Sequence, residues 1–282
     1  MTDSPIVTRF APSPTGHLHK GHAYSALQAS RFARKLGGRF LLRIENIDFT
    51  RCKPENTDQI LEDLAWLGIE WEEPVRVQGQ HLADYESAAN RLREEGFLYP
   101  CFCTRKDIER ELAEAGQAPH SGTPLYPGTC RKLGPEERER RVVAGMEHCY
   151  RIDLQAALAS IDIDLEWNDS VSGIQRAQPE LLGDAILVRK DIATSYHLAV
   201  VVDDALQGIT DVVRGVDLFE STHLHVVLQR LLGLPTPTYH HHPLLTDESG
   251  NRLAKRDRSI TLKELRESGV TAEKLRAELG FS

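Results

Sequence analysis

The sequence has no long apolar run, no export signal pattern and few cysteines. No stretch of its 282 residues approaches the roughly 20 apolar residues that span a bilayer, so we expect no membrane-spanning helix. The first residues, MTDSPIVTRF, show no basic stretch followed by an apolar one, so we expect no secretory signal. Five cysteines, an odd number, do not indicate a disulfide framework. These absences predict a cytoplasmic protein in a reducing environment.

Basic residues are also fewer than acidic ones. Lys and Arg number 34 against 42 Asp and Glu, which gives a net charge of −8. Nucleic-acid-binding proteins usually carry a basic surface, so this balance disfavours that class. Positive residues nevertheless gather in residues 130–141 and 251–259. An RNA-contacting face on an otherwise acidic molecule therefore stays open.

The first hundred residues alternate between strand and helix patterns. Residues 6–12 read as a short strand that ends in a proline-rich loop, and residues 39–48 as a second strand with an acidic end. Between them, residues 21–36 place small and apolar side chains at helical spacing. This strand–helix–strand order predicts a parallel sheet. Residues 56–69 and 84–99 predict two further helices.

The pattern changes after Tyr99. Residues 100–135 are rich in Cys, Pro, Gly and charge and predict an inserted, loop-rich module, and residues 150–190 read as short strands. Residues 196–206 predict a buried strand, and residues 221–233 an amphipathic helix. The expected fold is an α/β, doubly wound parallel Rossmann-type sheet. A zinc-containing α+β insertion interrupts it, and a short helical C-terminal region follows.

We expect four segments in this chain. They are the first half of the Rossmann-type catalytic domain, an insertion with the zinc module, the second half of the catalytic domain, and a lysine loop with a short helical tail, at residues 1–87, 88–189, 190–240 and 241–282.

The stretch His19-Lys20-Gly21-His22 stands where a loop enters the first predicted helix. A helix N-terminus offers free N–H groups and the positive end of the dipole, which suits a phosphate. The two histidines lie one turn apart and can face the same phosphate. They could equally be polar residues at a helix start. A metal site is disfavoured because no carboxylate or cysteine lies at ligand spacing.

A second basic stretch, ESGNRLAKRDRS, lies more than two hundred residues later. It places Lys255 among arginines after a predicted turn, where a loop could close on the β- and γ-phosphates of ATP. Alone, it could equally be a solvated basic loop.

Together, these stretches resemble the catalytic core of the glutamyl-tRNA synthetases, a family of class I aminoacyl-tRNA synthetases. His19-Lys20-Gly21-His22 takes the place of the HIGH motif, and residues 252–256 that of the KMSKS motif, with Lys255 matching its second lysine. The resemblance runs from about residue 6 to about 260 and thins across 104–180. It departs at Arg252 and Ala254, where lysine and serine are usual, and the loss of a hydroxyl removes one phosphate contact.

The resemblance also implies the substrate residues. A substrate with two carboxylates and an ammonium calls for guanidinium groups and one carboxylate, which these positions supply. The residues implied for glutamate are Arg9, Phe10, Ala11, Pro12, Ser13, Glu45, Tyr196 and Arg214. Those implied for ATP are His19, Gly21, His22 and Lys255, of which His19, His22 and Lys255 are expected to be catalytic.

Three cysteines in the insertion predict a structural zinc site. Cys101 and Cys103 form a C-x-C step and Cys130 follows, but a closed zinc site needs a fourth ligand. General zinc chemistry favours His120. A shortened branch of the family, the glutamyl-queuosine tRNA(Asp) synthetases, carries a C-x-C…Y-x3-C pattern, and this resemblance favours Tyr126. Three cysteines without a metal remain the alternative. The other two thiols, Cys52 and Cys149, have no partners at ligand spacing.

The chain ends soon after Arg256, which leaves no room here for the large helical region that reads the anticodon in full-length glutamyl-tRNA synthetases. With the zinc pattern, this favours the shortened branch, which activates glutamate with ATP and Mg²⁺ and transfers it to queuosine at position 34 of tRNA(Asp). We expect a monomer that contacts the tRNA(Asp) anticodon loop. Three alternatives stay open: a truncated enzyme that charges a tRNA 3′ end, a small-molecule nucleotidyltransferase, and a non-enzymatic zinc-stabilised RNA-binding module.

Two further polar runs are not assigned a catalytic role. Residues 240–242, three histidines, lie in an apparent strand, where packing near the site is expected rather than metal binding. Asp203 and Asp204 end an apolar run and are left open between contacting a ribose and ordering a loop.

Overall fold

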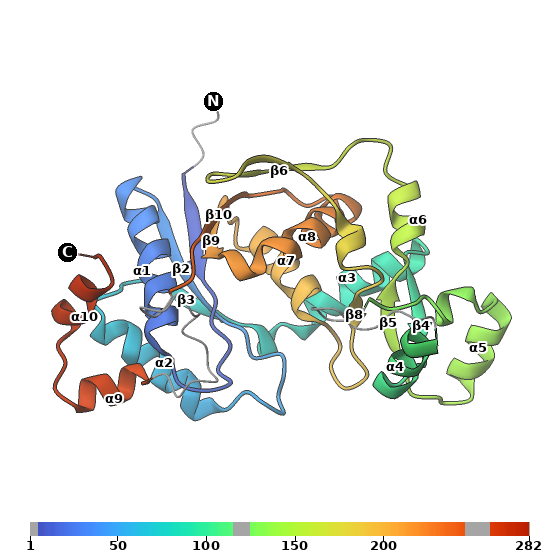
Figure 1. Ribbon diagram of the computed structural model, residues 1–282, viewed down its shortest axis with the longest axis horizontal. Helices are drawn as coiled ribbons and strands as arrows, with labels where there is room; N and C mark the ends of the chain where they lie inside the picture. Colours follow the sequence, from blue (N-terminus) through green and yellow to red (C-terminus); the bar gives the residue numbers. More distant parts are fainter. Residues whose placement is uncertain (1–4, 115–124, 246–259, 282) are drawn as a thin grey trace.

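The computed structural model describes residues 5–114, 125–245 and 260–281. Its first half contains three parallel strands in the order β1-β2-β3, with the helix α1 between β1 and β2 and α2 between β2 and β3 (Figure 1). The bounds are β1 Val7–Phe10, α1 Lys20–Lys35, β2 Arg39–Ile44, α2 Pro54–Trp66 and β3 Glu72–Val77. The parallel sheet predicted from the sequence is confirmed.

The second half contributes four more strands in the order β7-β6-β10-β9. β9, β10 and β6 run parallel, and β7 pairs antiparallel at the edge. Thr210, just before β9, donates its N–H to the Val7 carbonyl at 2.9 Å, which ties the two halves together. The strand order therefore reverses between β1 and β9, where open α/β sheets bind ligands. The bounds are β6 Glu166–Asp169, β7 Gly173–Arg176, β9 Asp211–Gly215 and β10 Thr238–His242.

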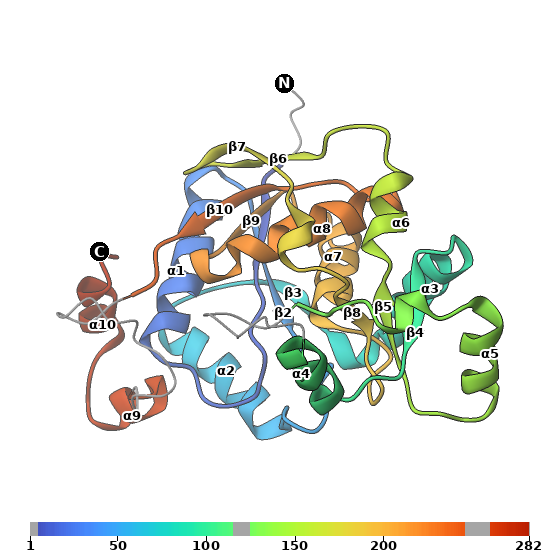
Figure 2. The same ribbon diagram turned by 45° about the vertical axis from the view of Figure 1, so that its right-hand side comes forward.

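Helices cover the sheet from both sides. α1 and α2 share an apolar core with the C-terminal helices α9 and α10, whereas α3, α7 and α8 form a second core (Figures 1 and 2). In the described residues, no helix is both long and apolar enough to cross a membrane. The bounds are α3 Leu82–Glu94, α7 Tyr196–Leu206, α8 Phe219–Leu232, α9 Leu262–Glu267 and α10 Ala272–Glu278.

A separate antiparallel sheet lies beside the α3–α7–α8 layer, in the order β4-β5-β8 (Figure 2). Its strands come from the range predicted as the insertion. The hairpin β6–β7 comes from the same range, yet pairs with β10 of the main sheet. The remaining bounds are β4 Leu98–Cys101, α4 Arg105–Glu114, α5 Pro135–Val143, β5 Cys149–Ile152, α6 Leu154–Ala159 and β8 Ile186–Val188, with single 3₁₀ turns η1 Gln78–Gln80, η2 Cys130–Lys132, η3 Pro179–Leu181 and η4 Val216–Leu218.

The strand predicted over 196–206 is wrong, because this segment forms the helix α7. Residues 198–204 are all buried, so the apolar run has no exposed face and no helical period. A helix buried on all sides cannot be told from a buried strand by pattern alone. The helix predicted over 84–99 is too long, since Gly96, at φ +82°, follows its end and β4 begins at Leu98.

The buried end of α7 carries two carboxylates that hold the layers together. Asp203 accepts hydrogen bonds from Arg76 Nε at 2.6 Å, Gln78 Nε2 at 2.8 Å and the Tyr85 hydroxyl at 2.9 Å. These partners belong to β3, η1 and α3. A buried carboxylate is tolerated only when it is fully paired, so this cluster fixes α7 against the sheet. The next residue, Asp204, belongs to the candidate site.

Candidate active site

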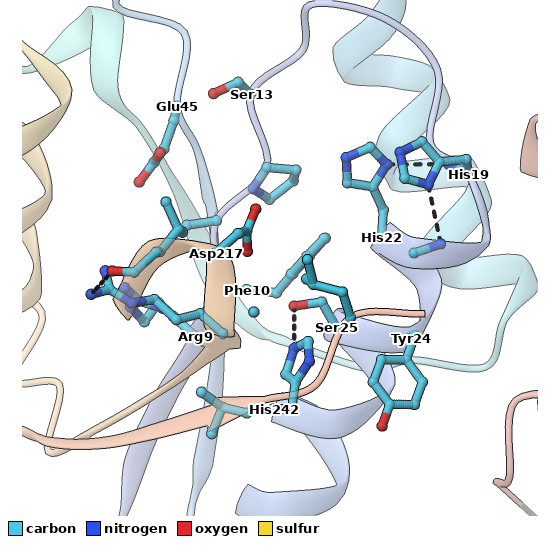
Figure 3. Close-up of a pocket in the computed structure, with 18 of the residues that line it drawn as sticks. Arg9, Phe10, Ser13, His19, His22, Tyr24, Ser25, Glu45, Asp217 and His242 are labelled. Carbon is cyan, nitrogen blue, oxygen red and sulfur yellow. Dashed lines mark hydrogen bonds between the residues drawn. The ribbon is translucent and has the colours of Figure 1, made fainter. Parts of the chain in front are cut away.

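A cavity of about 570 Å³ opens at the carboxyl ends of β1, β2, β9 and β10, where the strand order reverses (Figure 3). Every residue predicted for glutamate or ATP within the described part of the chain lines it. These residues are Arg9, Phe10, Ala11, Pro12, Ser13, His19, Gly21, His22, Glu45, Tyr196 and Arg214. Lys255, predicted to be catalytic, lies outside the described residues.

Two ends of the cavity differ in chemistry. Arg9 and Glu45 lie on one side and His19 and His22 on the other, with Asp217 between them (Figure 3). One side therefore offers an arginine and a carboxylate, and the other two imidazoles at a helix start. The cavity could hold a charged small molecule at one end and a phosphate at the other.

The histidine motif builds the N-terminus of α1. His19 is the N-cap, and its Nδ1 accepts the Gly21 N–H at 3.1 Å. His22 Nδ1 in turn accepts the His19 N–H at 3.2 Å, and the two rings lie 3.8 Å apart. A Cβ at position 21 would lie 2.9 Å from the His19 ring, which explains the glycine. The imidazoles act as a reciprocal cap and still line the cavity.

The described residues on either side of residues 246–259 lie at the cavity or at this motif. Leu245, the last described residue before it, lines the cavity. After it, Thr261 forms a β-bridge with His19, and the Leu262 N–H donates to the Leu18 carbonyl at 2.8 Å. One flank of residues 246–259 therefore lines the cavity, and the other contacts the histidine motif.

A buried ion cluster supports the other end. Asp204 accepts Arg9 Nε at 2.9 Å and Arg9 Nη2 at 3.1 Å, and also Arg43 Nη1 at 2.8 Å. Arg43 Nη2 donates to Glu45 at 3.2 Å. Asp203 and Asp204 are therefore both hydrogen-bonded to side chains of β1, β2, β3, η1 and α3. Of the two roles left open for them, ordering the structure is the one that these contacts support.

Burial and charge oppose each other in this cluster. Burial raises the pKa of Glu45 above its usual value, against the attraction of Arg43 and Arg9. For Asp204, burial also raises the pKa, but the two guanidiniums outweigh it and the pKa lies below the usual range. A cation that arrives beside Glu45 favours its ionised form.

Arg214 is held by four groups. Its Nε donates to His241 Nε2 at 3.1 Å, and Nη2 donates to the Leu218 carbonyl at 3.0 Å and Thr222 Oγ1 at 2.6 Å. Nη1 donates to the Tyr196 hydroxyl oxygen at 3.3 Å. The Tyr196 hydrogen and the second hydrogen of Nη1 remain for a ligand, so the pair can bind a carboxylate.

A buried histidine fixes the orientation of Arg214. His241 Nδ1 lies 2.7 Å from Asp169 Oδ2, and both side chains are almost fully buried. Burial, with the nearby Arg214, lowers the pKa of His241 to about 4, so the ring is neutral at pH 7. Asp169 accepts the Nδ1 proton, which leaves Nε2 as the acceptor that Arg214 needs.

The cysteines of the insertion form a cluster at the end of β4. The Sγ atoms of Cys101, Cys103 and Cys130 lie within 4.8 Å of one another. The Tyr126 hydroxyl lies 3.5 Å from Cys103 Sγ and accepts the Cys130 N–H at 2.8 Å. His120, the other predicted fourth ligand, lies outside the described residues.

Cys149 has a partner that its spacing did not predict. It lies opposite Cys101 across β4 and β5 and donates to the Cys101 carbonyl at 3.7 Å. Hydrogen bonds from Cys130 and Cys149 lower the pKa of Cys101. Strand pairing, which joins residues far apart in the sequence, produces this contact.

Sequence reasoning missed Arg43, which acts from behind Glu45. The histidines at 240–242 were expected in a strand near the site, and this is confirmed: His242 lines the cavity and lies 3.1 Å from Ser25 Oγ, and His241 lies behind Arg214. Arg43 could have been noticed, because a charged residue two positions before Glu45 in an apolar strand shares its face. No local signal identifies Asp169 as the partner of His241.

Comparisons with known proteins agree with this arrangement. The model of the family "tRNA synthetases class I (E and Q), catalytic domain" matches residues 5–280. The chain is 47% identical to the glutamyl-Q tRNA(Asp) synthetase of Rhodobacter capsulatus, over 98% of this chain and 100% of that protein. It is 43% identical to that of Symbiobacterium thermophilum, over 97% of this chain and 85% of that protein.

A solved structure shares the fold. The glutamate tRNA ligase of Elizabethkingia meningosepticum, in complex with its amino acid, superposes with a TM-score of 0.77 at 29% identity. The match covers 90% of this chain and 52% of that one. The chain therefore belongs to the class I tRNA synthetase (E and Q) family and is a ligase-type enzyme similar to the glutamyl-Q tRNA(Asp) synthetases.

Proposed function

We propose that this enzyme activates L-glutamate with ATP and transfers it to the queuosine base at position 34 of tRNA(Asp). The observation that carries the proposal is the cavity, which joins a guanidinium-rich pocket to a histidine-capped helix N-terminus. The choice of queuosine in tRNA(Asp) as the acceptor is supported by the relatives named glutamyl-Q tRNA(Asp) synthetase.

The pocket chemistry fits glutamate, whose net charge is −1. The buried guanidiniums of Arg9 and Arg214 line the cavity together with the buried carboxylate of Glu45. Glu45 receives the substrate ammonium. Tyr196 and Arg214 bind one carboxylate of glutamate. Arg9, which lines the same cavity, binds the other.

In the first step, an oxygen of the glutamate α-carboxylate attacks the α-phosphorus of ATP, and the bond to pyrophosphate breaks. The N-terminus of α1, His19 and His22 stabilise charge on the α-phosphate, and Lys255 does so on the leaving pyrophosphate. Magnesium, when bound with ATP, would neutralise part of the phosphate charge. The chain's contribution is to position the reactants and to stabilise charge.

In the second step, a hydroxyl of the queuosine cyclopentene ring attacks the carbonyl carbon of glutamyl-adenylate. The carbon–oxygen bond to AMP breaks, and the hydroxyl proton passes to solvent. The product is an ester of glutamate on the modified base.

We also propose that the cysteine cluster holds a structural zinc through Cys101, Cys103, Cys130 and Tyr126. Tetrahedral zinc with bonds of about 2.3 Å to sulfur places its sulfur ligands about 3.8 Å apart. The Cys103–Cys130 separation of 3.5 Å and the 3.5 Å from Cys103 to the Tyr126 oxygen are close to this geometry. The ion would cross-link β4 to η2.

The acceptor is tested with labelled glutamate and two preparations of tRNA(Asp), with and without queuosine. We expect label only on the queuosine-containing tRNA, because only that base carries the ring hydroxyls. Removal of the 3′-terminal adenosine is expected to leave labelling unchanged. Labelling that depends on the terminal adenosine and not on queuosine would contradict the proposal and identify 3′-end charging.

The role of Asp169 is tested by Asp169→Asn. The amide donates to His241 Nδ1, so the proton moves to Nε2, which then faces the Arg214 Nε–H donor to donor. We expect the KM for glutamate to rise about tenfold, the cost of one unsatisfied buried hydrogen bond, with the KM for ATP unchanged. Pyrophosphate exchange at varied glutamate and ATP measures both constants.

Asp211→Asn is the matched control. Asp211 Oδ1 lies 2.7 Å from Nε2 of His240, the neighbour of His241 on β10. The other ring nitrogen of His240 faces Ser170 Oγ and not Arg214. We expect this variant to keep its KM for glutamate. Equal effects of the two substitutions would refute the role of Asp169 in orienting Arg214.

The metal site is tested by elemental analysis of the purified enzyme. We expect about one zinc per chain, as in closed structural sites. Cys103→Ser is expected to lose most of this zinc and Tyr126→Phe to release it faster to a chromophoric chelator. Cys52→Ser, a thiol outside the cluster, keeps its zinc. Unchanged zinc in Cys103→Ser would sink the proposed ligand set.

A further inference from the structure

A second, larger cavity of about 1090 Å³ lies between the small sheet β4-β5-β8 and the N-termini of α7 and α8. Its wall includes Tyr126 of the cysteine cluster, Ile186 of β8 and Lys190 just after that strand. Figure 2 shows these elements side by side. None of the described residues predicted to bind glutamate or ATP lines this cavity. The proposed activation step therefore does not use it.

The two cavities share a wall. Tyr196 lines the glutamate cavity and the next residue, His197, lines the second. At the start of α8, Leu218 faces the first cavity, whereas Glu220 lines the second. Neighbouring residues at the starts of α7 and α8 therefore face different cavities.

The size and apolar surface of this cavity suit a flat ring. Its volume exceeds the 570 Å³ of the glutamate cavity and reaches the upper range of small-molecule pockets. Leu125 and Leu181 line it and are 48% and 49% exposed. They offer surfaces on which an unpaired nucleobase can pack.

The charged residues of the wall are of both signs. Arg105 and Lys190 are exposed and form no hydrogen bond or ion pair with any described residue, so they can contact RNA phosphates. Glu220 is also exposed and has no such partner in the described part of the chain. It belongs to the wall that the two cavities share.

Queuosine combines the groups that this wall can bind. It has a flat deazaguanine ring, a secondary amine that is protonated at neutral pH, and a cyclopentene diol beyond that amine. A carboxylate at the shared wall can bind the ammonium and thereby bring the diol towards the activated glutamate. Guanosine, which lacks the amine, would gain nothing from Glu220.

We propose that the second cavity is the acceptor pocket, which takes the queuosine nucleoside, with Glu220 bound to its ammonium and Lys190 and Arg105 against the flanking phosphates. This inference rests on the proposed function and adds a residue that selects the acceptor. Glu220 positions the acceptor and has no part in adenylate formation.

The test is Glu220→Gln, measured by two reactions. We expect kcat/KM for transfer to queuosine-containing tRNA(Asp) to fall about tenfold, the equivalent of one charge-assisted hydrogen bond. Glutamate-dependent pyrophosphate exchange without tRNA is expected to stay unchanged, because the adenylate forms in the other cavity.

Glu180→Gln is the matched control. Glu180 is also exposed and, like Glu220, acts on the charge of His223, but it lines a different hollow. We expect normal transfer from this variant. Unchanged transfer by Glu220→Gln, or equal losses in the two variants, would overturn the inference. A wild-type enzyme that performs exchange but transfers nothing to queuosine would instead contradict the proposed function.

Discussion

The carboxylate of Asp204 is the contact on which the arginine-containing end of the cavity depends. It binds Arg9 from β1 and Arg43 from β2, while its own helix, α7, belongs to the second half of the sheet. Desolvation makes a buried ion pair costly unless its geometry is good, so three charges in contact hold these elements in one arrangement. The guanidiniums are thereby positioned before any substrate arrives, which is the condition for electrostatic catalysis.

Much of the fold and of the cavity could be predicted from the sequence because the signals were local. Arg9, Glu45 and Arg214 could be assigned to one pocket from the family resemblance, and all three line one cavity. The two histidines around Gly21 cap the N-terminus of α1 reciprocally, a contact between residues only three positions apart. The predicted family membership is confirmed.

What the sequence could not reveal depends on burial and on contacts between distant residues. The segment 196–206 was predicted as a strand because complete burial removed its helical period. The contact of Asp169 with His241 joins β6 to β10, and that of Cys149 with Cys101 joins β5 to β4. The wall between the two cavities likewise exists only after folding. Lys255 and the domain boundaries remain predictions.

The central claim is that the pocket around Arg9 and Arg214 selects glutamate by charge. Calorimetric titration of the enzyme with L-glutamate and with L-glutamine tests it most directly, because the two amino acids have nearly the same shape. An uncharged amide loses a charge-assisted contact worth about 1.5–3 kcal/mol, so we expect glutamine to bind at least about tenfold more weakly. Equal affinities would contradict the account.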